Sequence, residues 1–359
     1  MNNQNDYNDN KKITYHEQTD ISNILKLREV LKTLPPFCRD YFRAMDPVTT
    51  TNTRISYAYD IRIFFQFLLD ENPAFKNYSL KDFTVDVLDQ LKAVDIEDYL
   101  EYLKVYKHGD KTETNGERGM KRKLSALRSF YAYYFKHEFI KTNPTVLVDV
   151  PKIHDKSIIR LDSDEVALLL DHIEHCGDEL TGQKRAYYEK TKERDLAIVT
   201  LLLGTGIRVS ECVGLDVEDI DFKNNGIKIT RKGGNEMVIY FGTEVEHALR
   251  RYLEVREGVI PMSGHEHALF YSTQRRRIGI QAVENLVKKY ARAVTTTKKI
   301  TPHKLRSTYG TALYQETGDI YLVADVLGHR DVNTTKKHYA AMDDARRRKA
   351  ASAVHLRED

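Results

Sequence analysis

Apolar side chains recur at helical spacing through the first part of the chain, between residues 21 and 143. A polar, Asn-rich start up to about residue 20 precedes them and is expected to be disordered. The segment 107–116 is polar as well, and we expect it to form a loop between helices. This part of the chain is therefore predicted to be helical. The repeats that carry the prediction are Ile55, Tyr59, Ile63 and Phe67 in one helix, and Leu124, Leu127, Tyr131 and Tyr134 in another.

The second part of the chain combines further helices with one small sheet. A helix is predicted to start where Asp162 or Ser163 can cap it. A buried helix at 196–203 is expected to stop at the Gly-Thr-Gly bend that follows it. Two short strands at 227–230 and 237–240 are joined by a glycine-rich turn, which predicts a hairpin. The predicted fold class is mainly α with a small β-sheet, in which a mixed α/β domain follows a helical one.

A polar segment with proline residues separates the two parts. Asn143-Pro144 and Pro151 cannot continue a helix, and the charged residues after Pro151 are typical of an exposed linker. The patterns thus predict five segments along the chain. They are a disordered tail at 1–20, a helical domain at 21–149, a linker at 150–160, a mixed α/β domain at 161–342 and a helical tail at 343–359.

Composition agrees with this picture and narrows the location of the protein. At 359 residues with 41% hydrophobic side chains, the chain is long enough for two domains that each bury a core. No apolar run approaches the length of a membrane span, and the start lacks the pattern of a signal peptide, so we expect a cytoplasmic protein. The scattered cysteines indicate neither a disulfide framework nor a zinc site. A net charge of +3 is too small to argue for nucleic acid by itself.

Arg208 follows the Gly-Thr-Gly bend at the predicted start of a new helix. Backbone geometry rather than a long loop would hold an arginine there, and its guanidinium can offer a fork of donors to a phosphate. Glu211, one helical turn later, could orient that guanidinium through a charge-assisted hydrogen bond. A surface arginine at a helix start is the ordinary alternative for an isolated residue of this kind.

The segment from Thr301 to Arg306 has the chemistry of a helix start. Thr301 can act as the N-cap and Pro302 suits the first helical position. His303 and Arg306 would then lie side by side at the positive end of the helix. Because that end favours an anion, a phosphate could sit against both side chains.

Three further side chains complete the set of candidate chemical groups. His329 is expected just beyond a helix at 319–327 that ends at Gly328. Lys232 lies in the turn of the predicted hairpin, where a lysine can reach bound DNA and protonate a leaving oxygen. A phenol such as Tyr339 can act as a nucleophile where a base and positive charge are close. Together these groups could break and rejoin a phosphodiester without metal or ATP.

The series Arg, Lys, His-x-x-Arg, His and Tyr, in this order and spacing, resembles the tyrosine recombinase (phage integrase) family, particularly its Xer-like branch. The resemblance implies a helical core-binding domain and a catalytic domain that close around DNA as a clamp. It also implies a cofactor-free reaction in which a tyrosine attacks the scissile phosphate, giving a 3′-phosphotyrosine and a free 5′-hydroxyl. Strand exchange would follow through a Holliday junction within a homotetramer on paired inverted half-sites. The implied catalytic residues are Arg208, Lys232, His303, Arg306, His329 and the nucleophile Tyr339, with Glu211 in a supporting part.

Two basic stretches are candidates for DNA contacts, because they lie where the two domains of the resembling family grip the duplex. A charge run is usually a solvated face, so position along the chain is what favours DNA here. His265 and His267 lack a supporting metal-binding pattern, and we interpret them as structural. The DNA-binding candidates are Arg118, Lys121, Arg122, Lys123 and Arg128 on the polar side of one helix, and Arg275, Arg276 and Arg277 before another.

Two other functions agree with parts of this pattern. A type IB topoisomerase relaxes supercoils by similar chemistry without exchanging partners, and its activity on a single-site plasmid would distinguish it. A non-catalytic DNA-binding protein on the same scaffold could lose Tyr339 or Arg306 without penalty, so their joint presence argues against it. The target site stays open, as does the choice between chromosome dimer resolution and integration or excision of a mobile element. The tail at 343–359 is expected to dock in trans on a neighbouring subunit.

Overall fold

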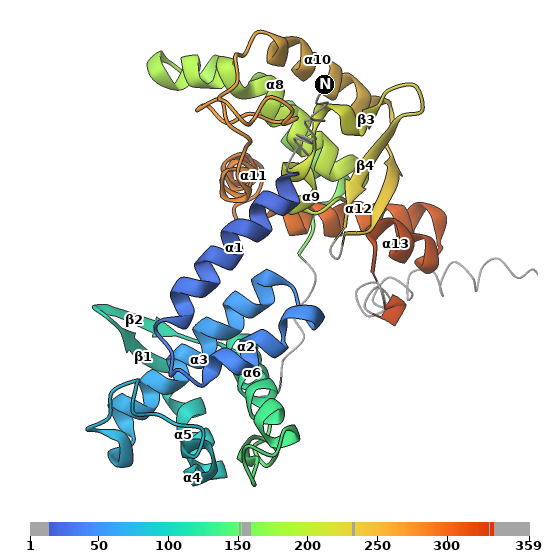
Figure 1. The fold of residues 1–359 in the computed structure, drawn as a ribbon. Coiled ribbons are helices and arrows are strands. Elements are labelled where there is room, and N and C mark those ends of the chain that lie inside the picture. Colours follow the sequence, from blue (N-terminus) through green and yellow to red (C-terminus); the bar gives the residue numbers. More distant parts are fainter. Residues whose placement is uncertain (1–13, 151, 153–158, 232–233, 330, 334–359) are drawn as a thin grey trace, which may run out of the picture. The chain divides into compact units, whose positions relative to one another are not determined.

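The computed structural model describes residues 14–150, 152, 159–231, 234–329 and 331–333. Internal contacts divide the chain into two compact units, Met1–Asp155 and Lys156–Asp359 (Figure 1). The division falls in the predicted linker at 150–160, most of which lies outside the described residues. Among the helices of the described ranges, none combines the length and apolar character needed to cross a bilayer.

The first unit is a group of helices around an aromatic core. The helix α3 (Thr51–Glu71) packs against α1 (Tyr15–Leu31), α5 (Ala93–Tyr102) and α6 (Glu117–Lys136). The predicted apolar repeat of α6 is buried in this core, whereas in the predicted repeat of α3 only Ile55 and Phe67 are buried and Tyr59 and Ile63 are partly buried. Other residues of the same helices complete the core, where rings such as Phe65 and Phe130 meet edge to face. The shorter elements are α2 (Cys38–Ala44), α4 (Val87–Gln90) and the 3-10 turns η1 (Asp46–Val48), η2 (Pro73–Phe75) and η3 (Pro144–Val146).

The prediction of a loop at 107–116 is wrong. Most of this segment belongs to a hairpin of the strands β1 (Val105–His108) and β2 (Lys111–Thr114). The pairing runs from Val105 opposite Thr114 to His108 opposite Lys111, and Gly109 turns the chain with a φ of +59°. All four residues of β2 are exposed, so no alternation of buried and exposed positions marks this strand in the sequence. The first unit is therefore not helical throughout.

The first helix also begins earlier than the predicted disordered tail at 1–20 allows. Helix α1 starts at Tyr15, directly after Thr14. The Thr14 hydroxyl accepts a hydrogen bond from the Glu17 N–H at 3.3 Å, and the Glu17 carboxylate accepts one from the Thr14 N–H at 2.8 Å. This reciprocal capping box lets a polar segment begin a helix.

The second unit packs helices around α8 (Gly182–Thr205) and carries a three-stranded antiparallel sheet of order β3-β4-β5 at one side (Figure 1). The central helix α8 packs against α7 (Ser163–His175), α10 (Thr243–Glu257) and α12 (Pro302–Thr317). The other elements are η4 (Cys176–Glu179), α9 (Val209–Gly214), η5 (Val217–Asp219), β3 (Ile220–Asp221), β4 (Gly226–Thr230), β5 (Glu236–Tyr240), α11 (Ile280–Val294) and α13 (Ile320–Leu327). The predicted fold class, mainly α with a small sheet, is confirmed.

Four predicted helix ends in this unit are confirmed in position, whereas the helix predicted at 196–203 begins earlier, at Gly182. Asp162 is the N-cap of α7, and Gly206 and Gly328 end α8 and α13 in the left-handed conformation. Thr301 is the N-cap of α12 and Pro302 its first residue, but the Thr301 carbonyl rather than its hydroxyl receives the first N–H groups. Local capping chemistry thus sets where these helices begin and end.

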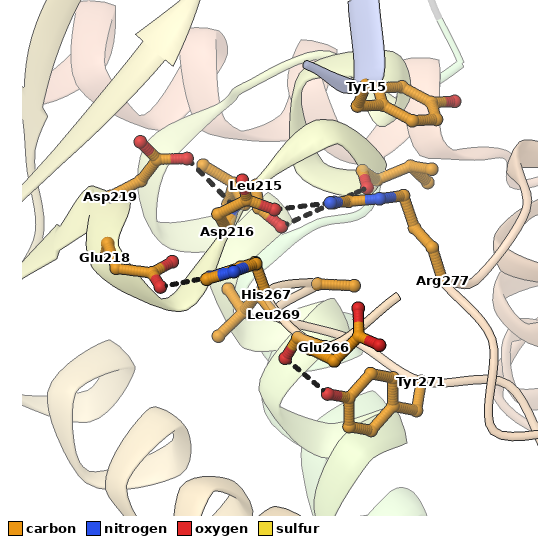
Figure 2. A network of polar contacts seen from close by, with 12 residues as sticks. Tyr15, Leu215, Asp216, Glu218, Asp219, Glu266, His267, Leu269, Tyr271 and Arg277 are labelled. Atoms are coloured by element: carbon orange, nitrogen blue, oxygen red, sulfur yellow. Dashed lines mark hydrogen bonds and ion pairs between the residues drawn. The ribbon is translucent and has the colours of Figure 1, made fainter. Parts of the chain in front are cut away.

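A polar network beside α9 uses Arg277 inside the fold (Figure 2). The Arg277 guanidinium donates to the Val213 carbonyl at 3.0 Å and to the Leu215 carbonyl at 2.7 Å, and it forms an ion pair with Asp216. These bonds satisfy carbonyls at the end of α9. In the same network His267 pairs with Glu218, which agrees with a structural part for this histidine.

The buried residue Asp60 connects three helices of the first unit through its carboxylate and its backbone carbonyl. Asp60 of α3 is 2% exposed and forms an ion pair with Arg122 of α6. Lys123, also buried, has its Nζ 3.9 Å from Asp60 and donates to the Asn115 side-chain oxygen at 2.7 Å. The Tyr99 hydroxyl of α5 donates to the Asp60 carbonyl at 3.4 Å. Burial raises the pKa of Asp60 to about 6, against the opposing effect of Arg122 and Lys123.

Replacing this carboxylate should change how stability depends on pH. Because the folded-state pKa of Asp60 lies above the value of 3.8 for a free side chain, the folded protein binds this proton more tightly than the unfolded one. Ionisation of Asp60 therefore lowers the free energy of unfolding as pH rises from about 4 to about 6. The stability of Asp60→Asn relative to the parent should increase over that window, by up to roughly 3 kcal/mol, and then level off. Urea unfolding measures this difference, and a relative stability that falls with pH would contradict the raised pKa.

Candidate active site

The C-terminal end of α13 is the point where the candidate residues meet. Four consecutive carbonyls, Asp325 to Gly328, end this helix, and each accepts a hydrogen bond from an arginine side chain. The donors are Arg208 at the start of α9, Arg231 after β4, and Arg306 in α12. Carbonyls at a helix C-terminus lack partners within the helix and carry partial negative charge, so guanidinium groups are favourable donors there.

Arg208 is fixed by Glu211, as the sequence predicts. The Arg208 backbone N–H donates to one Glu211 carboxylate oxygen at 2.7 Å, and Nη1 donates to the other at 2.8 Å. Nη2 donates to the Gly328 carbonyl at 3.2 Å. The Glu211 side chain is only 4% exposed, whereas that of Arg208 is 36% exposed. A buried carboxylate therefore orients a guanidinium that remains accessible to a ligand.

Arg306 joins the ends of two helices from within the protein. Its Nη1 donates to the Gly206 carbonyl at 2.5 Å, and its Nη2 donates to the Leu327 carbonyl. The residue is 4% exposed, and a buried charge of this kind requires such partners. The bend after α8, which leads to Arg208, is thereby held against the end of α13.

The two candidate histidines lie in α12 and directly after α13. His303 is exposed in the first turn of α12, one turn before Arg306. His329 directly follows Gly328, and its backbone N–H donates to the Ala324 carbonyl at 2.9 Å. The backbone position of His329 therefore depends on the geometry of the α13 terminus.

Two glycines permit the close approach of these groups. Gly206 and Gly328 have φ angles of +62° and +61°, in the region that favours glycine. A Cβ atom on Gly206 would lie 2.3 Å from Cδ1 of Tyr309, and one on Gly328 would lie 1.9 Å from Nη1 of Arg231. Any side chain at either position would displace a part of the site.

Arg231 is the residue of this cluster that sequence reasoning does not single out. It precedes Lys232 in the predicted turn, and a basic pair in a glycine-rich turn is the only local signal. Burial lowers the pKa of Arg231; the nearby Glu211 carboxylate opposes this shift, and the Arg208 charge adds to it. The sequence-predicted Lys232, Tyr339 and the tail at 343–359 lie outside the described residues.

Of the basic side chains predicted to bind DNA, several have hydrogen-bond partners or buried positions within the fold. Lys123 is buried, so it does not lie on the polar side of its helix. Arg128 donates to the carbonyls of Thr145 and Val148, at 3.1 and 2.5 Å, and Arg277 caps the end of α9. Helical periodicity cannot reveal these roles, because the accepting carbonyls lie elsewhere in the sequence. The candidates that remain exposed are Arg118, Lys121, Arg122, Arg275 and Arg276.

The arrangement at the end of α13 suits a phosphate group. Three guanidinium groups surround one helical turn, and the buried carboxylate that opposes them is that of Glu211. An arginine fork matches two phosphate oxygens, and fixed positive charge stabilises the extra negative charge of a pentacoordinate phosphorus. Of the three arginines, Arg208 has the accessible guanidinium, at 36% exposure, so it is the best candidate of the three to meet such a group directly.

Comparisons with known proteins identify the class. The sequence profile of the phage integrase family matches residues 160–346. The chain is 31% identical over 341 residues to the tyrosine recombinase XerS of Lactococcus lactis subsp. cremoris (strain MG1363), covering 88% of this chain and 93% of the relative. It is 33% identical over 348 residues to the tyrosine recombinase XerC of Caldanaerobacter subterraneus subsp. tengcongensis, covering 93% and 91%. The chain therefore belongs to the phage integrase family, whose tyrosine recombinases are enzymes that cleave and rejoin DNA.

Solved structures share the fold at lower identity. The XerH site-specific recombinase bound to its difH substrate matches with a TM-score of 0.59 and 21% identity, covering 84% of this chain and 79% of that one. The Tn1549 transposon integrase in complex with circular intermediate DNA matches with a TM-score of 0.60 and 22% identity, covering 84% and 94%. The predicted family and the predicted enzyme class are both confirmed.

Substitution of Gly206 tests whether close packing at the bend maintains the site. Gly206→Ala should lower the free energy of unfolding by about 2–4 kcal/mol, because the left-handed conformation costs about 1–2 kcal/mol and the contact with Tyr309 adds overpacking. Gly182→Ala is the matched control, since Gly182 also has a positive φ of +56° but has no atom within 4 Å of the added Cβ. Urea unfolding should show a clearly larger loss for Gly206→Ala, and equal losses would contradict the packing argument.

Proposed function

We propose that this protein is a site-specific recombinase that cleaves double-stranded DNA through Tyr339 and rejoins it with a partner strand. The observation that carries the proposal is the convergence of Arg208 and Arg306 on the end of α13, beside His329. Family membership supports the same conclusion, because tyrosine recombinases cleave and rejoin DNA. The relatives XerS and XerC are similar over most of their length, which favours the complete reaction over DNA binding alone.

In the proposed reaction the phenolate oxygen of Tyr339 attacks the scissile phosphorus. The bond from phosphorus to the 5′-oxygen breaks, which leaves a 3′-phosphotyrosine, and Lys232 donates a proton to the departing oxygen. Arg208, Arg306 and His329 stabilise the pentacoordinate phosphorus, and His303 assists the nucleophile. Attack by the 5′-hydroxyl of a partner strand reverses the steps and releases the tyrosine. Every proton and electron pair is exchanged within protein and DNA, so the mechanism uses no metal or other cofactor.

The proposed substrate is DNA with paired inverted half-sites, bound by a homotetramer in the cytoplasm. The first unit, with residues 21–149, is proposed as the core-binding domain and residues 161–342 as the catalytic domain. Exposed basic side chains on both units can contact phosphates without sequence preference. The tail at 343–359 is proposed to dock on a neighbouring subunit. The side chains proposed to contact DNA are Arg118, Lys121, Arg122, Arg275 and Arg276.

Removing the proposed nucleophilic oxygen tests the function directly. Tyr339→Phe should abolish covalent capture of a nicked suicide substrate while leaving half-site affinity nearly unchanged, because a single hydroxyl is lost. Tyr321→Phe is the control, since Tyr321 is 71% exposed on α13 and also loses one hydroxyl. A denaturing gel displays the covalent band. A band that persists in Tyr339→Phe would move the nucleophile to another residue.

The proposed general acid is tested through the leaving group. Lys232→Ala should slow cleavage of an ordinary phosphodiester on the order of 10²–10⁴-fold, yet hardly affect a substrate with a 5′-bridging sulfur, since a thiolate leaves without a proton. Lys228→Ala is the control on the same hairpin, where Lys228 pairs with Glu236 at 3.0 Å, and it should slow neither substrate. Equal slowing of both substrates by Lys232→Ala would assign Lys232 to phosphate binding or folding.

A further inference from the structure

Arg231 ties the β4–β5 hairpin to the end of α13. Its backbone closes the hairpin, because the Arg231 N–H donates to the Asn235 carbonyl at 2.8 Å and the Arg231 carbonyl accepts from the Gly234 N–H at 3.0 Å. Its guanidinium donates to the Asp325 carbonyl at 3.2 Å and to the Val326 carbonyl at 2.6 Å. Both ends of this residue are therefore fixed, one in the sheet and one on the helix.

The position of the Arg231 guanidinium is unfavourable for the isolated protein in two ways. Its Nε is buried without a hydrogen-bond partner among the described residues. The positive group also lies close enough to Arg208 for that charge to lower its pKa, in addition to the larger effect of burial. Buried unpaired donors and neighbouring like charges both reduce stability, and such arrangements concentrate at functional sites.

We propose that Arg231 is a positioning residue for DNA cleavage, acting at the scissile phosphate through the end of α13. This inference rests on the proposed function, in which Arg208 and His329 stabilise the phosphorus. Arg231 holds the Asp325 and Val326 carbonyls and lies against Gly328, whose carbonyl binds Arg208. It therefore fixes the peptide that carries His329.

Arg231 acts by holding the helix rather than by touching DNA. Both of its Nη atoms are engaged with carbonyls, and its Nε is buried. Without these bonds the last turn of α13 loses two charge-assisted donors and can fray, which would move His329 and the Gly328 carbonyl. A displacement of about 1 Å in a catalytic group can reduce a rate by about 10²-fold.

The test compares Arg231→Ala, Arg231→Lys and the parent on a nicked suicide substrate. Arg231→Ala should reduce the first-order rate of covalent capture at saturating protein by about 10–100-fold, with half-site affinity within about threefold of the parent. Arg231→Lys keeps the charge but has one ammonium in place of the fork, so its rate should be intermediate. Arg256→Ala is the matched control, because Arg256 donates to the Ala268 and Leu269 carbonyls, both at 3.1 Å. It should lower the melting temperature without reducing the capture rate. A normal rate in Arg231→Ala would overturn the inference.

Two further readouts separate positioning from other effects. Arg231→Ala should slow the phosphodiester and the 5′-bridging sulfur substrate equally, since it acts at the phosphorus. Selective slowing of the phosphodiester would assign Arg231 to the turn of Lys232 instead and overturn the inference. The double variant Arg231→Ala/His329→Ala should lose clearly less rate than the product of the two single losses, because part of the effect of Arg231 passes through His329 and the rest through the Gly328 carbonyl that binds Arg208. Losses that multiply would contradict that route.

The same gel distinguishes this inference from the proposed function. If the parent forms a covalent complex that Tyr339→Phe abolishes, the proposed function stands, and a rate in Arg231→Ala equal to that of the parent then overturns the positioning role alone. A parent that forms no covalent complex, or a Tyr339→Phe variant that still forms one, overturns the proposed function and with it this inference.

Discussion

Hydrogen bonds from arginine side chains to the last carbonyls of α13 hold the candidate site together. The donors and acceptors are between 21 and 120 positions apart in the chain, and they connect α9, the β4–β5 hairpin and α12 to one helical turn. A neutral donor could satisfy such a carbonyl, but only a cation also opposes the negative end of the helix and attracts a phosphate. Hydrogen bonds to charged groups contribute about 1.5–3 kcal/mol each, so these side chains stabilise the fold while they gather positive charge at the end of α13.

In both units, arginine side chains donate hydrogen bonds to backbone carbonyls. A basic residue in this chain is therefore not automatically a candidate for contact with DNA. Arg128 caps the carbonyls around η3, Arg256 and Arg277 bind carbonyls of loops in the second unit, and Lys123 is buried beside Asp60. A guanidinium has five donors in a fixed plane and can satisfy several carbonyls at once where a loop leaves them unpaired. Some of the basic side chains that the structure describes are therefore structural, and a bare count of basic residues overstates the positive surface available to DNA.

Local chemistry made a large part of the fold predictable. The N-caps Asp162 and Thr301 and the left-handed glycines at 206 and 328 act within one turn of the chain, so the sequence alone places these helix ends correctly. The β1–β2 hairpin escapes prediction because β2 is exposed on every residue and lacks the alternation of a half-buried strand. The role of Arg231 could not be predicted for a different reason, because its carbonyl partners in α13 are 94 and 95 positions away in the sequence.

The order of the elements along the chain bears on when this site can exist during protein synthesis. Arg208 is made early in the second unit, but the Gly328 carbonyl that it binds, and the Leu327 carbonyl that Arg306 binds, lie at the end of α13, more than 100 positions after Arg208. Domains tend to fold as units as they leave the ribosome. A chain released before α13 would contain both arginines but not the helix end that gathers them. The candidate site can therefore form only after α13 has been made, and a product terminated before α13 would lack the helix end that its arginines bind.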